Sequence, residues 1–178
     1  MRERIIVAGV GGQGILLAGK LVIRAGMEKN LNVTYIPSYG AEVRGGTAHC
    51  HLIVSEEEIA SPIIEHPDFA LVLNTPSLIK FSARVETGGI VICNRSLADP
   101  GRVSSSGTII GIPATEMAET LGSAKVANMV MLGAFLRRSR LLDPDTLKET
   151  LIRFLPGRHR DLLEANLKAL EQGYDFEP

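Results

Sequence analysis

The sequence has few cysteines, few aromatic residues, no tryptophan and almost no net charge, and these shortages exclude several kinds of protein. Its 178 residues include only two cysteines, Cys50 and Cys93, too few for a disulfide framework or for the four thiolates of an iron–sulfur or zinc centre. Electron transfer on such a centre is therefore expected on another chain. Nineteen basic and twenty acidic residues leave a net charge of -1, without the basic excess that nucleic-acid binding requires. We expect no nucleic-acid partner.

Long hydrophobic runs are also lacking. The longest uncharged stretch that looks buried, Val126 to Leu136, is far shorter than the roughly 18 apolar residues of a membrane-spanning helix. Met1 to Arg4 lead directly into an apolar segment, without the pattern of a secretory signal. The sequence therefore predicts a cytoplasmic protein with no membrane partner. Its 45% hydrophobic and 22% charged residues are typical of a folded chain, and its length predicts a single domain over residues 1–178.

Short apolar runs bounded by glycine, proline and polar residues predict six strands, at residues 5–9, 33–36, 49–54, 69–74, 90–93 and 108–112. Helical patterns follow the first strand at 13–27 and the fourth strand from Thr75, and continue at 126–136, after Asp143-Pro144 and at 160–172. The first two strands and the helix between them are expected to form a βαβ unit. The predicted fold class is α/β: a three-layer, Rossmann-like, mainly parallel or mixed sheet with helices on both faces and a helical C-terminal portion.

The first informative motif is residues 9–14, Gly-Val-Gly-Gly-Gln-Gly, which matches G-x-G-x-x-G between a predicted strand and a predicted helix. Such glycines permit positive φ angles and close approach of a ligand, and the helix N-terminus offers N–H groups to a phosphate. The second strand ends at Ile36 to Tyr39 without a carboxylate for the ribose hydroxyls of a dinucleotide, which disfavours NAD or FAD. Phosphate binding and tight packing at an interface both stay open. The candidate cofactor-binding residues are Gly9, Gly11, Gly12, Gln13 and Gly14.

The second motif is the loop at residues 37–47, which combines three glycines with a carboxylate, a guanidinium and a phenol. A simple connection would be shorter, and functional groups concentrate on loops that a rigid sheet presents. Arg44 suits bidentate contact with a carboxylate or phosphate, whereas the alternative is that Glu42 and Arg44 pair and hold the loop. We expect the loop to meet the first glycine turn at the carboxyl ends of adjacent strands. The candidate binding or interface residues are Ser38, Tyr39, Gly40, Glu42, Arg44, Gly45 and Gly46.

The side chains that suggest catalysis or metal binding have simpler interpretations. His49, Cys50 and His51 are consecutive in a predicted strand, so the two histidines share one face and Cys50 lies on the other. With no third ligand nearby, packing is favoured over a metal site. No nucleophile, histidine and acid occur in a defensible order. We therefore assign no catalytic and no metal-binding residue to this chain.

The glycine motif at residues 9–14 and the loop at residues 37–47 resemble segments of a known family. Gly-x-Gly-Gly-Gln-Gly, then Ser-Tyr-Gly-Ala-Glu-x-Arg-Gly-Gly, then Ala127-Asn128-Met129 with Leu132-Gly133 resemble the gamma subunit of 2-oxoacid:ferredoxin oxidoreductases, a family acting on pyruvate, 2-ketoisovalerate or 2-oxoglutarate. The resemblance extends from Ile5 to about Gly133, and the Arg-Gly-Gly loop is its most specific part. Asn128 is added as a candidate interface or packing residue.

The resemblance implies a subunit of an enzyme that oxidatively decarboxylates a 2-oxoacid with coenzyme A and reduces ferredoxin. It implies alpha, beta and delta-type partner subunits, with thiamine diphosphate on alpha and beta and iron–sulfur clusters on beta and delta chains. The isolated chain is then expected to be inactive, and coenzyme A is the leading candidate for an anionic ligand near the glycine turn. A stand-alone nucleotide-binding Rossmann-type enzyme and a non-enzymatic interaction domain are the alternatives. The sequence leaves open which 2-oxoacid is used and whether the isolated chain forms a homodimer.

Overall fold

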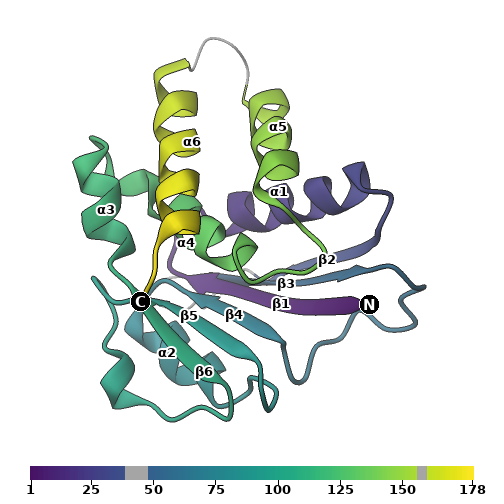
Figure 1. Cartoon of the computed structure of the whole chain (residues 1–178). Helices are drawn as coiled ribbons and strands as arrows, with labels where there is room; N and C mark the ends of the chain where they lie inside the picture. Colours follow the sequence, from purple (N-terminus) through teal and green to yellow (C-terminus); the bar gives the residue numbers. More distant parts are fainter. Residues whose placement is uncertain (39–47, 156–159) are drawn as a thin grey trace.

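The computed structural model describes residues 1–38, 48–155 and 160–178, and a six-stranded sheet lies at its centre (Figure 1). In chain order its elements are β1 (Arg2–Gly9), α1 (Ile15–Glu28), β2 (Asn32–Ser38), β3 (Ala48–Ser55), β4 (Phe69–Val72), α2 (Thr75–Ser82), β5 (Ile90–Asn94), the 3-10 turn η2 (Pro100–Arg102), β6 (Thr108–Ile112), α3 (Ala114–Thr120), the 3-10 turn η3 (Ala124–Val126), α4 (Ala127–Leu136), α5 (Pro144–Phe154) and α6 (Arg160–Asp175).

The strand order is β2-β3-β1-β4-β5-β6. β1, β4, β5 and β6 are parallel, whereas β3 runs antiparallel to both of its neighbours, β1 and β2. The prediction of neighbouring first and second strands is wrong, because β3 lies between them. β3 pairs along its length with β1, from Gly9 opposite Ala48 to Arg2 opposite Ser55, and with β2 on its other edge. Periodicity within a strand identifies the strand but carries no information about its partners.

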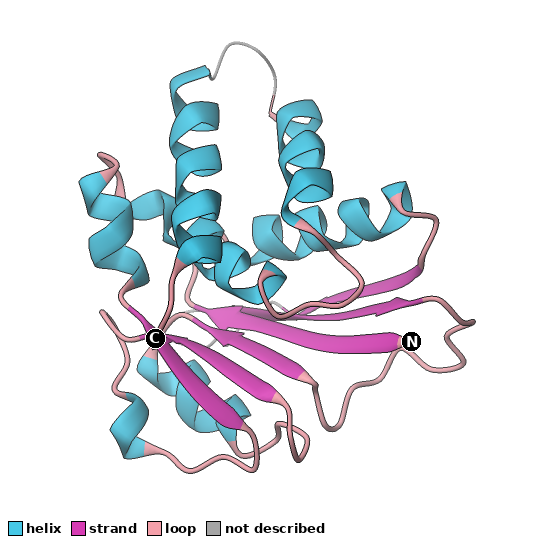
Figure 2. Ribbon diagram, viewed as in Figure 1, coloured by secondary structure: helices cyan, strands magenta, loops and turns pink. Residues whose placement is uncertain are grey.

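The sheet is covered on both faces, but unequally. α1, α4, α5 and α6 lie over one face and α2 lies under the other (Figure 2). β1 shows why this arrangement is stable: Ile5 and Val7 belong to the larger core, Ile6 and Ala8 to the smaller one, and none is more than 1% exposed. A strand buried on both faces is expected to be continuously apolar. The predicted α/β fold, with a mixed sheet, helices on both faces and a helical C-terminal portion, is confirmed.

Glycines allow close packing on the larger face. A Cβ atom at Gly19 of α1 would lie 2.6 Å from Cys50 Sγ, and one at Gly26 would lie 2.8 Å from Val33 Cγ1. α1 therefore packs directly on β2 and β3. Every residue of α4 is buried, as its apolar sequence predicts, and α6 crosses it where Gly133 and Gly173 bring the two backbones together. No described helix has the length and apolar character needed to cross a lipid bilayer.

Candidate functional site

The glycine turn connects the carboxyl end of β1 to α1. Gly12 and Gly14 have φ angles of 89° and 71°, in the left-handed region that favours glycine. Gln13 holds the turn, because its Oε1 accepts a 2.8 Å hydrogen bond from Val10 N and its Nε2 donates a 3.3 Å bond to Leu73 O. A Cβ atom at Gly9 would lie 2.7 Å from Ile15 Cδ1, so this glycine serves close packing. The Gln13 side chain is thus used within the protein, which the sequence alone did not indicate.

The open side of the turn is formed by Gly11 and Gly12. A Cβ atom at either position would have no neighbour within 4 Å among the described residues. Gly11 has no positive φ angle, so its small size is not required by the described fold. Open space beside exposed backbone at the start of a helix is the arrangement that anion-binding glycine turns use.

Asn128 connects α4 to the same turn. It is 3% exposed, and its Nδ2 donates a 3.2 Å hydrogen bond to Gly14 O, while its Oδ1 is buried with no partner among the described residues. Its side chain also occupies the space that a Cβ atom at Gly14 would need. The structure therefore brings together two residues that are 114 positions apart.

A crevice opens beside the turn, between the carboxyl ends of β1 and β4. These parallel neighbours are followed by α1 and α2, which lie on opposite faces of the sheet, so the chain leaves the two strands in opposite directions. Ligands of open α/β sheets bind at such a point. The cavity here measures about 220 Å³, and its lining residues are Gly12, Gln13, Leu73, Asn94, Leu97, Thr115, Ala124, Lys125 and Ala127.

Three polar residues of this crevice were missed by sequence reasoning. Asn94 ends β5 fully buried; its Nδ2 donates a 2.8 Å hydrogen bond to Thr115 Oγ1, and its Oδ1 accepts from Ser96 N at 3.3 Å. Lys125 is exposed on η3 and is the only charged residue among the described residues of the lining. An amide at the carboxyl end of an apolar strand was the available signal for Asn94. For Lys125 and Thr115 the sequence offered no signal, because both are far from the glycine turn in the sequence and reach it only through the fold.

The second predicted motif lies largely outside the described residues. Ser38 is exposed at the end of β2. The expectation that the strand before this loop, β2, is adjacent to β1 is wrong, because β3 lies between them. The ends of β1 and β2 nevertheless lie at one edge of the sheet, since Gly9 pairs with Ala48 and Ser38 pairs with His49. Tyr39, Gly40, Glu42, Arg44, Gly45 and Gly46 lie outside the described residues.

The His49, Cys50 and His51 side chains alternate as predicted. The His49 ring lies 5.1 Å from the Phe81 ring and 5.4 Å from the His51 ring, whereas Cys50 is fully buried on the opposite face. Burial, together with the positive charges of nearby His49, Arg84 and Lys80, lowers the pKa of His51 to about 4. No three His, Cys, Asp or Glu side chains in the described ranges are grouped so as to hold a metal ion. These contacts are those of packed side chains.

The family model described as pyruvate ferredoxin/flavodoxin oxidoreductase matches residues 4–176. Ketoisovalerate oxidoreductase subunit VorA of Methanothermobacter marburgensis is 35% identical over 97% of the chain, which spans only 36% of that protein. 2-Oxoglutarate synthase subunit KorC of Methanocaldococcus jannaschii is 32% identical, and the match covers 98% of this chain and 94% of that subunit.

A solved structure shows the same fold. The 2-oxoglutarate:ferredoxin oxidoreductase of Magnetococcus marinus, with 2-oxoglutarate, coenzyme A and succinyl-CoA bound, superimposes with a TM-score of 0.87 at 24% identity. The match covers 97% of this chain and 30% of that one. The chain thus corresponds to nearly all of one relative and to about a third of longer chains.

Proposed function

The chain belongs to the pyruvate ferredoxin/flavodoxin oxidoreductase family, and from this premise we propose that it is the gamma-type subunit of a 2-oxoacid:ferredoxin oxidoreductase. The assembled enzyme would convert a 2-oxoacid and coenzyme A to acyl-CoA and carbon dioxide, and would pass the electrons released to ferredoxin. Its partners would be alpha, beta and delta-type subunits, and we place the complex in the cytoplasm. The near-complete match to KorC supports a separate subunit of this size.

The observation that carries the proposal is the crevice beside the glycine turn. Within the described part of the chain, Gly11 and Gly12 leave open space at the backbone, and Lys125 contributes the single charge of the lining. This arrangement suits an anionic group, for which coenzyme A is the candidate, and coenzyme A is bound in the related Magnetococcus marinus enzyme. A cavity of about 220 Å³ would enclose one phosphate-bearing part of the molecule, since pockets for whole drug-sized ligands measure roughly 300–1,000 Å³.

The strand order weighs against a stand-alone dinucleotide enzyme. In a dinucleotide-binding fold, one strand leads into the glycine turn, and an acidic residue at the end of the neighbouring strand binds the ribose hydroxyls. Here the strand next to β1 on that side is the antiparallel β3, whose first residue, Ala48, lies at this edge. The nearest parallel strand end on that side is Ser38 of β2, one strand further away and without a carboxylate. NADH is therefore expected to bind weakly or not at all.

The cysteines support placing the redox centres on partner subunits. Cys50 belongs to the core on the α1 face of the sheet and Cys93 to the core on the α2 face. Burial raises the pKa of Cys50 to about 12 and that of Cys93 to about 11, so both thiols stay protonated. Two protonated thiols on opposite faces of a sheet do not form a ligand set. Thiamine diphosphate and the iron–sulfur clusters are accordingly proposed to lie on the partner subunits.

Replacing Gly11 tests the crevice directly. The Gly11→Ala variant should fold normally, because its Cβ meets no atom of the described residues within 4 Å, but the added methyl group would obstruct a ligand at the turn. Gly111→Ala in β6 is the matched control, since its Cβ makes only ordinary contacts and Gly111 does not line the crevice. Calorimetric titration with coenzyme A should show about tenfold or greater weakening of binding for both Gly11→Ala and Lys125→Gln. The first variant obstructs the ligand, and the second removes a charge-assisted contact. Wild-type affinity in both variants, or micromolar affinity for NADH, would contradict the assignment.

Reconstitution with the partner subunits tests the assembly. The purified chain should be colourless and should not decarboxylate 2-oxoacids, whereas the complete complex should reduce ferredoxin. A brown preparation of the chain alone would exclude the placement of the iron–sulfur clusters on partner subunits.

Arg44→Ala should leave the chain folded, because an exposed ion pair contributes about 0–1 kcal/mol, while weakening assembly or ferredoxin reduction. Substitution of Gly45 or Gly46 should be tolerated less well. A sharply lower melting temperature with intact assembled activity would show that Arg44 is structural.

A further inference from the structure

The Thr115 hydroxyl on α3 and the Asn94 amide at the end of β5 lie next to each other in the lining of the crevice beside the glycine turn. We propose that the Thr115 hydroxyl donates a hydrogen bond to a phosphate oxygen of the ligand, and that Asn94 is the positioning residue that leaves the hydroxyl proton to the crevice. This inference rests on the function proposed above, because it takes coenzyme A, which carries a phosphomonoester and a diphosphate, as the ligand.

Two backbone N–H groups fix the orientation of the Asn94 amide. Ser96 N and Thr115 N donate to Asn94 Oδ1 at 3.3 and 3.4 Å. Because N–H groups require an acceptor, the atom that faces them is the amide oxygen, and the other atom is Nδ2. Nδ2 then donates a 2.8 Å hydrogen bond to Thr115 Oγ1. Asn94 is fully buried, so bulk solvent does not compete for these bonds.

The bond from Asn94 determines what the Thr115 hydroxyl can offer to a ligand. A hydroxyl group has one proton and can both accept and donate, and here its oxygen accepts from Asn94. Its own proton forms no hydrogen bond with any described residue. By contrast, the hydroxyl of Thr120 at the end of the same helix donates to Met117 O at 2.7 Å. The proton of Thr115 is therefore left for a group in the crevice.

The side-chain acceptors of the crevice are already used within the protein. Gln13 Oε1 accepts from Val10 N at 2.8 Å, and Asn94 Oδ1 and Thr115 Oγ1 accept the bonds given above. Lys125 forms no ion pair with any described residue. Within the described lining, a ligand thus meets donors and a cation but no side-chain acceptor that lacks a partner. An ionised phosphate meets this requirement, whereas an amine or amide would leave its N–H groups unpaired.

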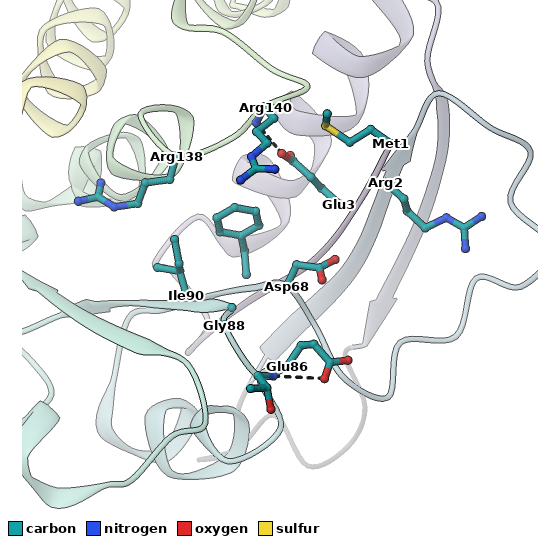
Figure 3. A pocket seen from close by; sticks show the side chains of 12 residues that line it. Met1, Arg2, Glu3, Asp68, Glu86, Gly88, Ile90, Arg138 and Arg140 are labelled. Carbon is teal, nitrogen blue, oxygen red and sulfur yellow. Dashed lines mark hydrogen bonds between the residues drawn. The ribbon is translucent and has the colours of Figure 1, made fainter.

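A cavity of about 280 Å³ at the opposite edge of the sheet suits an anion less well. It lies at the amino ends of β1, β4 and β5, and its lining includes the carboxylates of Glu3, Asp68 and Glu86. The Arg2 and Arg138 side chains point away from these acids (Figure 3). Because like charges repel, the phosphate is assigned to the crevice at the carboxyl ends of the strands.

Calorimetric titration of the chain with coenzyme A tests the hydroxyl donor. Thr115→Val keeps the shape of the side chain and should weaken binding about tenfold or more, as expected for loss of a hydrogen bond to a charged group. Thr115→Ser restores the hydroxyl and should bind within about threefold of the wild type. Thr120→Val is the matched control, because it removes a hydroxyl from the same helix outside the crevice, and it should change the affinity less than about twofold.

Asn94→Asp tests the positioning role. The carboxylate has the shape of the amide and can still accept from Ser96 N and Thr115 N, but it accepts the Thr115 hydroxyl proton instead of donating to Oγ1. The substitution should therefore remove the contribution of the hydroxyl and also repel the phosphate. In a Thr115→Val background only the repulsion remains. Asn94→Asp should accordingly weaken binding about tenfold more in the wild type than in that background.

Phosphorus NMR of the bound coenzyme A identifies the group that Thr115 contacts. Thr115→Val should shift the resonance of either the phosphomonoester or the diphosphate, and Thr115→Ser should restore it. Wild-type affinity in Thr115→Val, equal weakening by Thr120→Val, equal effects of Asn94→Asp in the two backgrounds, or identical phosphorus resonances in all variants would each overturn this inference while leaving the function proposed above intact. Failure of the wild-type chain to bind coenzyme A would overturn both.

Discussion

Replacing Gly14 by alanine should destabilise the chain for two separable reasons. Gly14 precedes α1 with φ 71° and ψ 24°, and an alanine in this left-handed conformation costs about 1–2 kcal/mol. The new Cβ would also lie 3.1 Å from Asn128 Cγ and would collide with the amide nitrogen that donates to Gly14 O. Displacing that amide removes a buried hydrogen bond, for a further loss of about 0.5–1.5 kcal/mol. We expect the free energy of unfolding to fall by about 2–3 kcal/mol.

Gly12→Ala and Asn128→Ala separate the two contributions. Gly12 has φ 89°, but a Cβ there meets no described residue within 4 Å, so its replacement should show only the cost of the backbone conformation, about 1–2 kcal/mol. In an Asn128→Ala background the collision and the hydrogen bond are both absent, and Gly14→Ala should then cost about as much as Gly12→Ala. The double-mutant cycle should give a coupling energy of about 1 kcal/mol between Gly14 and Asn128.

Urea unfolding followed by far-UV circular dichroism is the suitable assay, because the chain has no tryptophan. If Gly14→Ala costs no more than Gly12→Ala, the contact between Asn128 and the turn makes no measurable contribution. If the Asn128→Ala background leaves the cost of Gly14→Ala unchanged, the two residues are uncoupled, and α4 does not hold the glycine turn.

Three further predictions concern packing and titration. Gly133→Ala should lower the free energy of unfolding by about 1–3 kcal/mol or more in urea titrations, because its Cβ would collide with Leu170 O where α4 crosses α6; an unchanged midpoint would refute this crossing. Cys50 and Cys93 should react with a thiol reagent at pH 8 only after urea is added, because burial raises both pKa values; fast labelling of the native chain would contradict their burial. The pKa of His51 is lowered to about 4, chiefly by burial, so as the pH falls from about 6.5 the unfolded chain takes up a proton at His51 before the folded chain does. The free energy of unfolding should therefore decrease between about pH 6.5 and 4, and it should decrease less in His51→Asn.

Local signals in the sequence were sufficient for most of the secondary structure. The strand predicted at 90–93 is found as Ile90–Asn94, and the helix predicted after Asp143 begins at Pro144 with Asp143 Oδ1 accepting from Thr146 N at 2.8 Å. Both depend on neighbouring residues only: a short apolar run in one case and a capping side chain followed by proline in the other. The alternation of His49, Cys50 and His51 has the same origin.

The candidate site was only partly predictable. The position of the glycine turn between β1 and α1 follows from its sequence, because the turn is local. The role of Gln13 does not, since its Nε2 reaches Leu73, 60 residues away. Asn94 ends β5, whereas Thr115 and Lys125 lie in the segment that follows β6. They meet because β5 and β6 are parallel, so that both strands end at the same edge of the sheet.

By itself, the sequence determined which segments are strands and helices, where the glycine turn lies, and that the helix α4 is buried. These features depend on interactions within a few residues, or on the total apolar content of a segment. Only the tertiary structure decided that β3 lies between β1 and β2, that Asn128 contacts Gly14, and that Asn94 and Lys125 line one crevice beside the glycine turn. Strand order and pocket composition result from long-range pairing, in which many arrangements of the same elements bury similar apolar area and side-chain fit selects one.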